Sequence, residues 1–209
     1  MPQTRSRLKT EEKFLRAVLE LVANKGCSAL GINAVAQTAG SDKVLIYRYF
    51  NNLNGLLERA AESRNWMPTV CETLSSLALS EDHQGADALD QVARLLIRHI
   101  RADQTTHQLV RWRKAQKNPL TDYFSDEWQA FWSELPDALS IGLDYQSREN
   151  WKQASSLTAL IVEAELCNES VDFSCLNLFA NAICIGQLQE EGSDPSDYGY
   201  NDQLPTNLL

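Results

Sequence analysis

The sequence predicts an all-α fold, in which a small N-terminal module of three helices precedes a larger C-terminal helical domain. Apolar residues recur at spacings of three and four, which is typical of amphipathic helices. No run of alternating β-branched residues indicates a strand. Glycine, proline and helix-capping residues separate the apolar stretches into about nine helical segments. A chain of 209 residues is long enough for one large domain or two small ones.

The first helix is predicted over residues 11–24. Thr10 is a suitable N-terminal cap, and Gly26 is placed to end the helix with a left-handed residue. Its apolar face follows the spacing of a helix and consists of Phe14, Ala17, Val18, Leu21 and Val22.

Two short helices are predicted next, over residues 32–39 and 43–50. Gly40 breaks the first helix because it accepts a positive φ, and Asp42 caps the second. Ile46 and Phe50 lie one turn apart and are expected to face inward. The side chains that this leaves exposed on the second helix are Lys43, Val44, Tyr47 and Arg48.

The rest of the chain is also predicted to be helical. A helix that begins near Leu53 is expected to continue to about Leu77, with a kink or break at Pro68. A loop over residues 80–85 follows. The later helices are predicted over residues 89–100, residues 106–116 (closed by Asn118 and Pro119), an aromatic stretch at 124–135, and two long apolar stretches at 148–167 and 174–189.

We therefore divide the chain into an N-terminal module (residues 1–52), a helical domain (residues 53–189) and an acidic tail (residues 190–209), which we expect to be mobile. Charge is distributed unevenly between these parts. Residues 1–60 contain nine Lys and Arg against five Asp and Glu, whereas residues 61–209 contain ten against twenty-three. The module can therefore approach a polyanion that would repel the helical domain.

The stretch GINAVAQTAGSDKVLIYRYFNNLNGLL, residues 31–57, contains the chemistry that points to a function. Two short helices joined by a glycine turn allow the first to brace the second, which can then enter a DNA major groove. The order of these elements, and above all Ile46-Tyr47-Arg48-Tyr49-Phe50, resembles the DNA-binding module of TetR-type transcriptional regulators. The close resemblance covers roughly residues 10–60.

The resemblance implies roles for individual residues on the two helices. It assigns contacts with bases or phosphates to Asn33, Lys43, Val44, Leu45, Tyr47, Arg48 and Tyr49. Three positions depart from the family pattern. Gly31 stands at a capping position, Leu45 replaces a frequent hydroxyl residue, and Leu53 replaces a frequent lysine, which removes about one phosphate contact. The alternative is that the two helices only fill a core.

The basic residues Arg5, Arg7 and Lys9 form either a flexible arm that contacts DNA or a solvated tail. Double-stranded DNA is the expected partner, with no role for a membrane.

The last two predicted helices are apolar on more than one face, so a second copy of the chain is the expected partner of one face. The resemblance implies a homodimer with a four-helix interface. The alternative is that both helices are internal to one protomer. The predicted interface residues are Trp151, Thr158, Ile161, Val162, Leu176, Phe179, Ile183 and Gly186.

Aromatic residues concentrate in the middle of the helical domain. They are interpreted either as the lining of a pocket for a small, mostly apolar effector or as plain core packing. These residues are Trp112, Phe124, Trp128, Phe131 and Trp132. The basic cluster nearby is expected to be a solvated helix face, with an anchor for an acidic ligand as the alternative; it consists of Arg111, Arg113, Lys114 and Lys117. Glu163 and Glu165 are expected at exposed or interface-edge positions, with pocket anchors as the alternative.

The sequence contains no signature of an enzyme, so we expect no enzymatic activity. We also expect no cofactor and no bound metal. His83, His99 and His107 lack metal-ligand spacing, and the five cysteines include no CxxC pair. No apolar run is long enough to span a bilayer, and no secretory signal is visible, which favours a cytoplasmic protein.

The sequence therefore predicts a DNA-binding regulator that acts as a homodimer on a palindromic operator and responds to a ligand, with repression as the usual sign in the family. The alternatives are an effector-independent architectural or partner-recruiting factor and a helical interaction module without DNA binding.

Overall fold

The computed structural model describes residues 2–77, 86–140 and 145–167, and its regular structure in these ranges is entirely helical. The all-α prediction is confirmed for this part of the chain. The predicted loop 80–85, helix 174–189 and tail 190–209 lie outside the described residues. The elements are α1 (Pro2–Lys25), η1 (Cys27–Ala29), α2 (Ile32–Ala39), α3 (Lys43–Phe50), α4 (Leu53–Ala61), α5 (Val70–Ser76), α6 (Ala86–Ala102), α7 (Gln104–Trp112), α8 (Pro119–Leu139) and α9 (Tyr145–Cys167).

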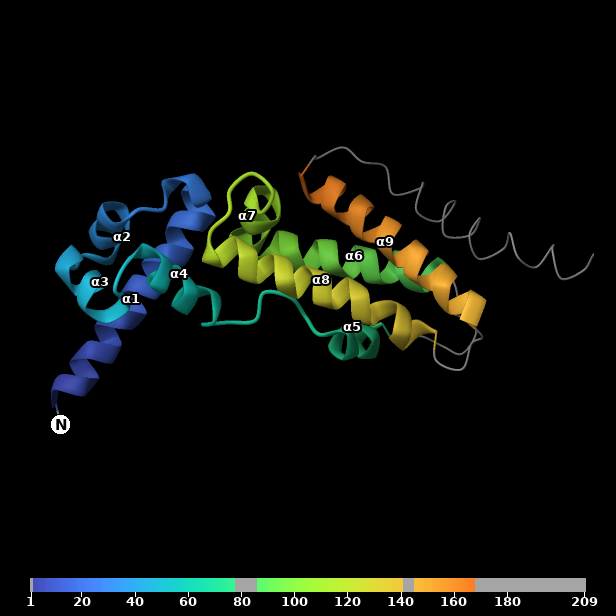
Figure 1. The fold of residues 1–209 in the computed structure, drawn as a ribbon, viewed down its shortest axis with the longest axis horizontal. Coiled ribbons are helices and arrows are strands. Elements are labelled where there is room, and N and C mark those ends of the chain that lie inside the picture. The colour runs from blue at the N-terminus through green and yellow to red at the C-terminus, as the bar shows by residue number, and fades with distance from the viewer. Residues whose placement is uncertain (1, 78–85, 141–144, 168–209) are drawn as a thin grey trace, which may run out of the picture.

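The described part of the molecule is elongated, with α1–α4 at one end and the long helices α6, α8 and α9 at the other (Figure 1). Helix α7 lies between these two parts and contacts α1 on one side and α6, α8 and α9 on the other. Helix α4 packs on both α1 and α8, so it links the two ends. The predicted boundary after residue 52 falls immediately before this linking helix.

Local signals explain the small N-terminal helices, whose predicted boundaries are confirmed. Gly40 ends α2 in the left-handed conformation (φ 57°, ψ 40°), and the Asp42 side chain accepts a hydrogen bond from Val44 N at 2.9 Å to cap α3. Phe50 is buried against Phe14 of α1, with the two rings edge to face at 6.2 Å. Ile46 is fully buried beside them, so α3 is fixed along one face.

Helix α1 is longer than predicted, because it begins at Pro2 and continues through Thr10. Thr10 is therefore not its N-cap. Arg7 forms an ion pair with Glu11 one turn later, at 2.6 Å, which supports the additional helix. The flexible-arm interpretation of Arg5, Arg7 and Lys9 is wrong, because these residues are part of α1.

The end of α1 also differs from prediction. Gly26 has a positive φ of 76°, but its ψ of 175° lies outside the left-handed helical region. Side chains rarely adopt this combination, which glycine tolerates. In addition, a Cβ at this position would lie 2.7 Å from Trp112 Nε1. Gly26 therefore permits both the backbone turn and the close approach of α7.

Two further boundaries correct the prediction. The helix that starts at Leu53 ends at Ala61, a segment of turns and bends that contains Pro68 follows, and Thr69 starts a separate helix with a capping box to Glu72. Asn118 and Pro119 begin α8 instead of closing α7: the Asn118 side chain accepts hydrogen bonds from the first turn, and proline suits the first helical position.

Candidate nucleic-acid interface

The exposed face of α3 is the part of the N-terminal module most suited to a ligand as large as DNA. Lys43 and Arg48 are exposed, and so are the hydrophobic side chains of Val44 (61%) and Tyr47 (50%). Burial of Ile46 on the opposite face holds the helix in place. This exposure confirms the predicted orientation of α3. In Figure 1, α3 lies at the outer end of the molecule, away from α5–α9.

Other residues assigned by the family resemblance take different positions. Asn33 is exposed on α2, whereas Leu45 and Tyr49 are half-buried and pack against the core. The Tyr49 ring contacts Phe50 edge to face at 6.4 Å, and the guanidinium of Arg7 lies 5.1 Å from its centre. Leu45 and Tyr49 therefore support α3 as well as bordering its exposed face.

The start of α4 lacks the family's lysine, as the sequence indicated. Leu53 is half-buried and packs against the core. The helix is capped instead by Asn52, whose side chain accepts a hydrogen bond from Gly55 N at 2.9 Å. The free N–H groups of this helix start are therefore partly satisfied within the chain.

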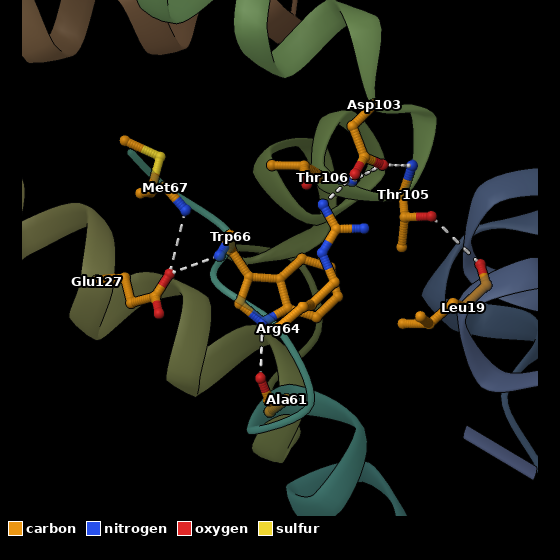
Figure 2. Close-up of polar contacts among 9 residues, drawn as sticks. All are labelled: Leu19, Ala61, Arg64, Trp66, Met67, Asp103, Thr105, Thr106 and Glu127. Carbon is orange, nitrogen blue, oxygen red and sulfur yellow. Dashed lines mark hydrogen bonds and ion pairs between the residues drawn. The ribbon is translucent and has the colours of Figure 1, made fainter. Parts of the chain in front are cut away.

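A polar junction connects the segment after α4 to the helical domain, and Figure 2 shows its contacts. Arg64 forms an ion pair with Asp103 at the start of α7, while its guanidinium lies over the Trp66 ring at 4.7 Å. Glu127 of α8 accepts hydrogen bonds from the backbone N–H groups of Trp66 (3.1 Å) and Met67 (3.2 Å). The junction thus fixes the extended segment that follows the module.

Helix ends are satisfied within the same junction. Asp103 also caps α7 by accepting from Thr105 N and Thr106 N, and Trp66 Nε1 donates to the carbonyl of Ala61 at the end of α4 (Figure 2). Thr105 Oγ1 donates to Leu19 O of α1 at 3.4 Å. Sequence reasoning missed this junction, although Asp103, two residues before Thr105, is a recognisable capping residue.

The pKa values of the two junction carboxylates, Asp103 and Glu127, are shifted in opposite directions. Burial is the largest influence on the pKa of Asp103 and raises it, but the Arg64 guanidinium and the N–H groups of Thr106 and Thr105 together lower the pKa below its usual value. For Glu127, burial dominates over the two backbone N–H groups, so its pKa is raised.

The aromatic residues predicted to line a pocket separate into two groups. Four of them lie on α8 and pack against one another in the core, with the centres of contacting rings 5.5–6.2 Å apart; they are Phe124, Trp128, Phe131 and Trp132. Trp112 instead lies half-buried at the end of α7 against Gly26. Trp132 Nε1 and Ser155 Oγ are buried with no hydrogen-bond partner among the described residues.

Two buried carboxylates of α9 form ion pairs with other parts of this domain. Glu163 of α9 accepts from Arg113 at 2.7 Å and Lys114 at 2.9 Å, and Arg113 lies over the Trp128 ring. Glu165 pairs with Arg101 of α6 at 2.7 Å. The expectation that Glu163 and Glu165 are exposed or at an interface edge is therefore wrong, and Arg113 is not a solvated member of the basic cluster.

Three of the eight residues predicted for a dimer interface are buried within the protomer. Trp151, Thr158 and Val162 are buried within it, and Ile161 is half-buried. The exposed apolar side chains of α9 are Leu157 (42%) and Leu160 (58%). The other predicted interface residues lie outside the described part of the chain; these are Leu176, Phe179, Ile183 and Gly186.

Within the described ranges, no group of three or more His, Cys, Asp and Glu side chains is arranged to hold a metal ion. None of the described helices has the length and apolar character needed to cross a bilayer.

Comparison with known proteins agrees with this geometry. Residues 14–60 match the family model described as bacterial regulatory proteins, tetR family. No curated protein matches the chain in sequence.

Several solved structures share the fold. A fatty acid degradation regulator, FadR from Bacillus halodurans, is 15% identical with a TM-score of 0.55, over 86% of this chain and 96% of that one. A TetR-like regulator from Rhodococcus sp. RHA1 is 9% identical with a TM-score of 0.54, over 86% and 96%.

A tetR-family regulator from Streptomyces coelicolor is 14% identical with a TM-score of 0.55, over 90% of this chain and 84% of that one. These identities establish the fold alone. The resemblance seen in the sequence is confirmed: residues 14–60 form a tetR-family domain, and the chain has the fold of TetR-family transcriptional regulators.

Proposed function

We propose, from its TetR-family fold, that this protein is a DNA-binding transcription regulator that acts as a homodimer on a palindromic operator and as a ligand-responsive repressor. The observation that supports DNA binding most strongly is the exposed face of α3. This face combines two cations with an apolar and a phenolic side chain, held by a buried face. A major groove accommodates such a helix, and its base edges and phosphates offer partners to all four side chains.

Charge supports the same orientation on DNA. Lys43 and Arg48 form no ion pair with other described residues, so their charges are available to phosphates or guanines. The acidic helical domain lies at the other end of the described molecule and would face away from the duplex (Figure 1).

The experiment that tests DNA binding starts with selection of genomic fragments by the purified protein at stated salt. Fluorescence anisotropy with a selected duplex then compares variants. Lys43→Ala and Arg48→Ala are each expected to weaken binding by about tenfold or more. Arg98→Ala, which removes an exposed cation from α6, is the matched control and should change little. Equal affinities for all three variants and the parent would contradict the proposal.

Dimerisation is proposed to use the exposed apolar face of α9. Leu157, Leu160 and Ile161 follow helical spacing on a different side of α9 from the buried Trp151, Thr158 and Val162. Two protomers related by a two-fold axis would present two α3 helices to half-sites about 34–36 Å apart.

Sedimentation velocity tests the dimer. Leu160→Glu is expected to shift the protein toward monomer, because it places a charge in an apolar contact. Tyr123→Glu, an exposed aromatic position on α8, is the control. A parent chain that stays monomeric at micromolar concentration would exclude the dimer.

The ligand response is proposed to involve the aromatic core of α8, as the sequence suggested. Trp132 Nε1 and Ser155 Oγ would supply polar anchors for a small, mostly apolar effector, since they have no partner among the described residues. A ligand that binds one spacing of the two α3 helices more tightly lowers operator affinity by that difference in binding energy.

A further inference from the structure

A cleft of about 450 Å³ lies where the end of α1 meets the end of α7. It is lined by Asn24 and Lys25 from α1 and by Gln108, Arg111, Trp112 and Ala115 from α7 and the turn after it. None of the other residues predicted to line an effector pocket belongs to this lining. The volume falls within the range usual for small-molecule sites.

The lining contains two cations and no acid. Lys25 and Arg111 are exposed and form no ion pair among the described residues, in contrast to Arg113 and Lys114, which share Glu163. Both free cations lie in the last turn of a helix, so each also faces a partial negative charge of about half a unit. The two full positive charges exceed the two partial negative charges of the helix ends by about one unit. The cleft is therefore suited to a monoanion.

The neutral residues add a flat surface and hydrogen-bond donors. Trp112 Nε1 donates to Gln108 Oε1 at 3.1 Å, which fixes the indole and leaves the amide N–H groups of Gln108 without a partner among the described residues. The indole also lies against Gly26, where a Cβ would be 2.7 Å from Nε1. The ring is therefore held in one position at the cleft.

We propose that this cleft binds a small planar carboxylate. Its carboxylate would lie between Lys25 and Arg111, since a guanidinium can bind both carboxylate oxygens, and its planar part would pack on the Trp112 indole. The cleft is lined by residues of α1, of α7 and of the turn after α7, whereas α3 lies at the outer end of the molecule (Figure 1), so DNA bound at α3 would leave it open.

The position of the cleft connects a ligand there to both ends of the molecule. Trp112 contacts the residue that ends α1, and its neighbour Arg113 extends into the helical domain, to Glu163 and the Trp128 ring. A carboxylate on Trp112 would therefore lie where α1 of the module packs against α7 of the domain. Its effect on DNA affinity rests on the proposed function, but its binding does not.

The test is a titration of ¹⁵N-labelled full chain with 1-naphthoate, followed through the indole N–H signals, with Trp112→Phe used to assign Trp112. We expect a saturable shift of the Trp112 signal. The neutral analogue 1-naphthamide is expected to bind about tenfold more weakly, because it lacks the charge that Lys25 and Arg111 recognise.

Lys25→Gln and Arg111→Gln should each weaken naphthoate binding by about fivefold or more. Arg98→Gln, the same loss of charge outside the cleft, should leave it unchanged. Unchanged dispersion of the remaining indole signals shows that each variant is folded. Equal binding of naphthoate and naphthamide, insensitivity to both cleft variants, or no saturable shift at millimolar naphthoate would each overturn the proposal. The titration contains no DNA, so its failure is distinct from failure of DNA binding.

Discussion

The two ends of the molecule use basic residues in opposite ways. In α1–α4, the ion pairs among described residues are between neighbours on one helix, as in Arg7 with Glu11, and the cations of α3 are unpaired. In the helical domain, pairs within one helix also occur, but Arg101 of α6 and Arg113 after α7 pair with acids of α9. Basic residues are therefore exposed and unpaired on α3, whereas in the helical domain some of them join one helix to another.

This difference follows from burial. An exposed pair contributes little to stability, because water and salt screen it. A buried charge that loses its partner is costly, because it keeps its desolvation penalty without compensation. The side chains of Arg113 and Glu163 are both only 9% exposed, so this pair falls in the second class.

The largest expected effect comes from breaking that buried pair. Glu163→Gln leaves Arg113 without its counter-charge and is expected to lower the free energy of unfolding by about 3–5 kcal/mol. Glu62→Gln, which breaks the exposed pair with Arg59 at the end of α4, should cost less than about 0.5 kcal/mol. Urea unfolding measures both. Similar small losses would mean that the two ends of the molecule do not differ in this respect.

The two faces of α3 should also respond differently. Ile46→Ala removes a fully buried side chain and is expected to cost about 3 kcal/mol of unfolding free energy. Val44→Ala should change stability by less than about 0.5 kcal/mol, because the side chain is mostly exposed. Thermal unfolding of both variants provides the measurement, and a large loss in Val44→Ala would show that this face is covered.

The turn after α1, which Trp112 of α7 approaches closely, is tested by substitution of Gly26. Gly26→Ala is expected to cost about 1–3 kcal/mol of unfolding free energy from the backbone alone, with a further loss from the clash with Trp112. Gly31→Ala is the control, because its φ of −171° is extended backbone and nothing lies within 4 Å of its added Cβ. Denaturant unfolding of both variants measures these losses. Equal losses of unfolding free energy in Gly26→Ala and Gly31→Ala would contradict this account.

A smaller effect is expected from pH at the junction. The lowered pKa of Asp103 means that its charged form stabilises the fold above the unfolded pKa, of about 4, and that this contribution is lost as pH falls through the folded pKa. The stability difference between the parent and Asp103→Asn should therefore be larger at neutral pH than in acid. The raised pKa of Glu127 predicts the opposite trend, since protonation relieves its penalty.

Unfolding curves of Asp103→Asn and Glu127→Gln at neutral and acidic pH distinguish these trends. Asp122→Asn on α8 serves as the control for loss of a carboxylate. A pH-independent difference for Asp103→Asn would show that its ion pair with Arg64 does not stabilise the junction.

Local signals were enough to predict the two short helices α2 and α3. Gly40 and Asp42 fix the boundaries of α2 and α3, and the spacing of Ile46 and Phe50 fixes the buried face. These signals act within a few residues, so the sequence contains them directly.

Contacts between distant residues could not be predicted in this way. The pairing of Arg113 with Glu163 joins positions fifty residues apart. Because of this pairing, Glu163 is buried, although the sequence predicted it at an exposed or interface-edge position. The extension of α1 to Pro2 was missed because Thr10 offered a capping signal that the longer helix does not use. Which face of α9 is exposed depends on how that helix packs against α6 and α8. The sequence of a helix that is apolar on several faces does not show which face this is.

The most direct test of the central claim is the salt dependence of affinity for a selected duplex. If the unpaired cations of α3 meet phosphates, Lys43→Ala and Arg48→Ala should each reduce the slope of log affinity against log salt by about 0.9 for each phosphate that the variant no longer neutralises. Arg101→Ala, which removes a cation paired with Glu165, should leave the slope unchanged. A slope that is the same for all four proteins would contradict the assignment of α3 to the DNA surface.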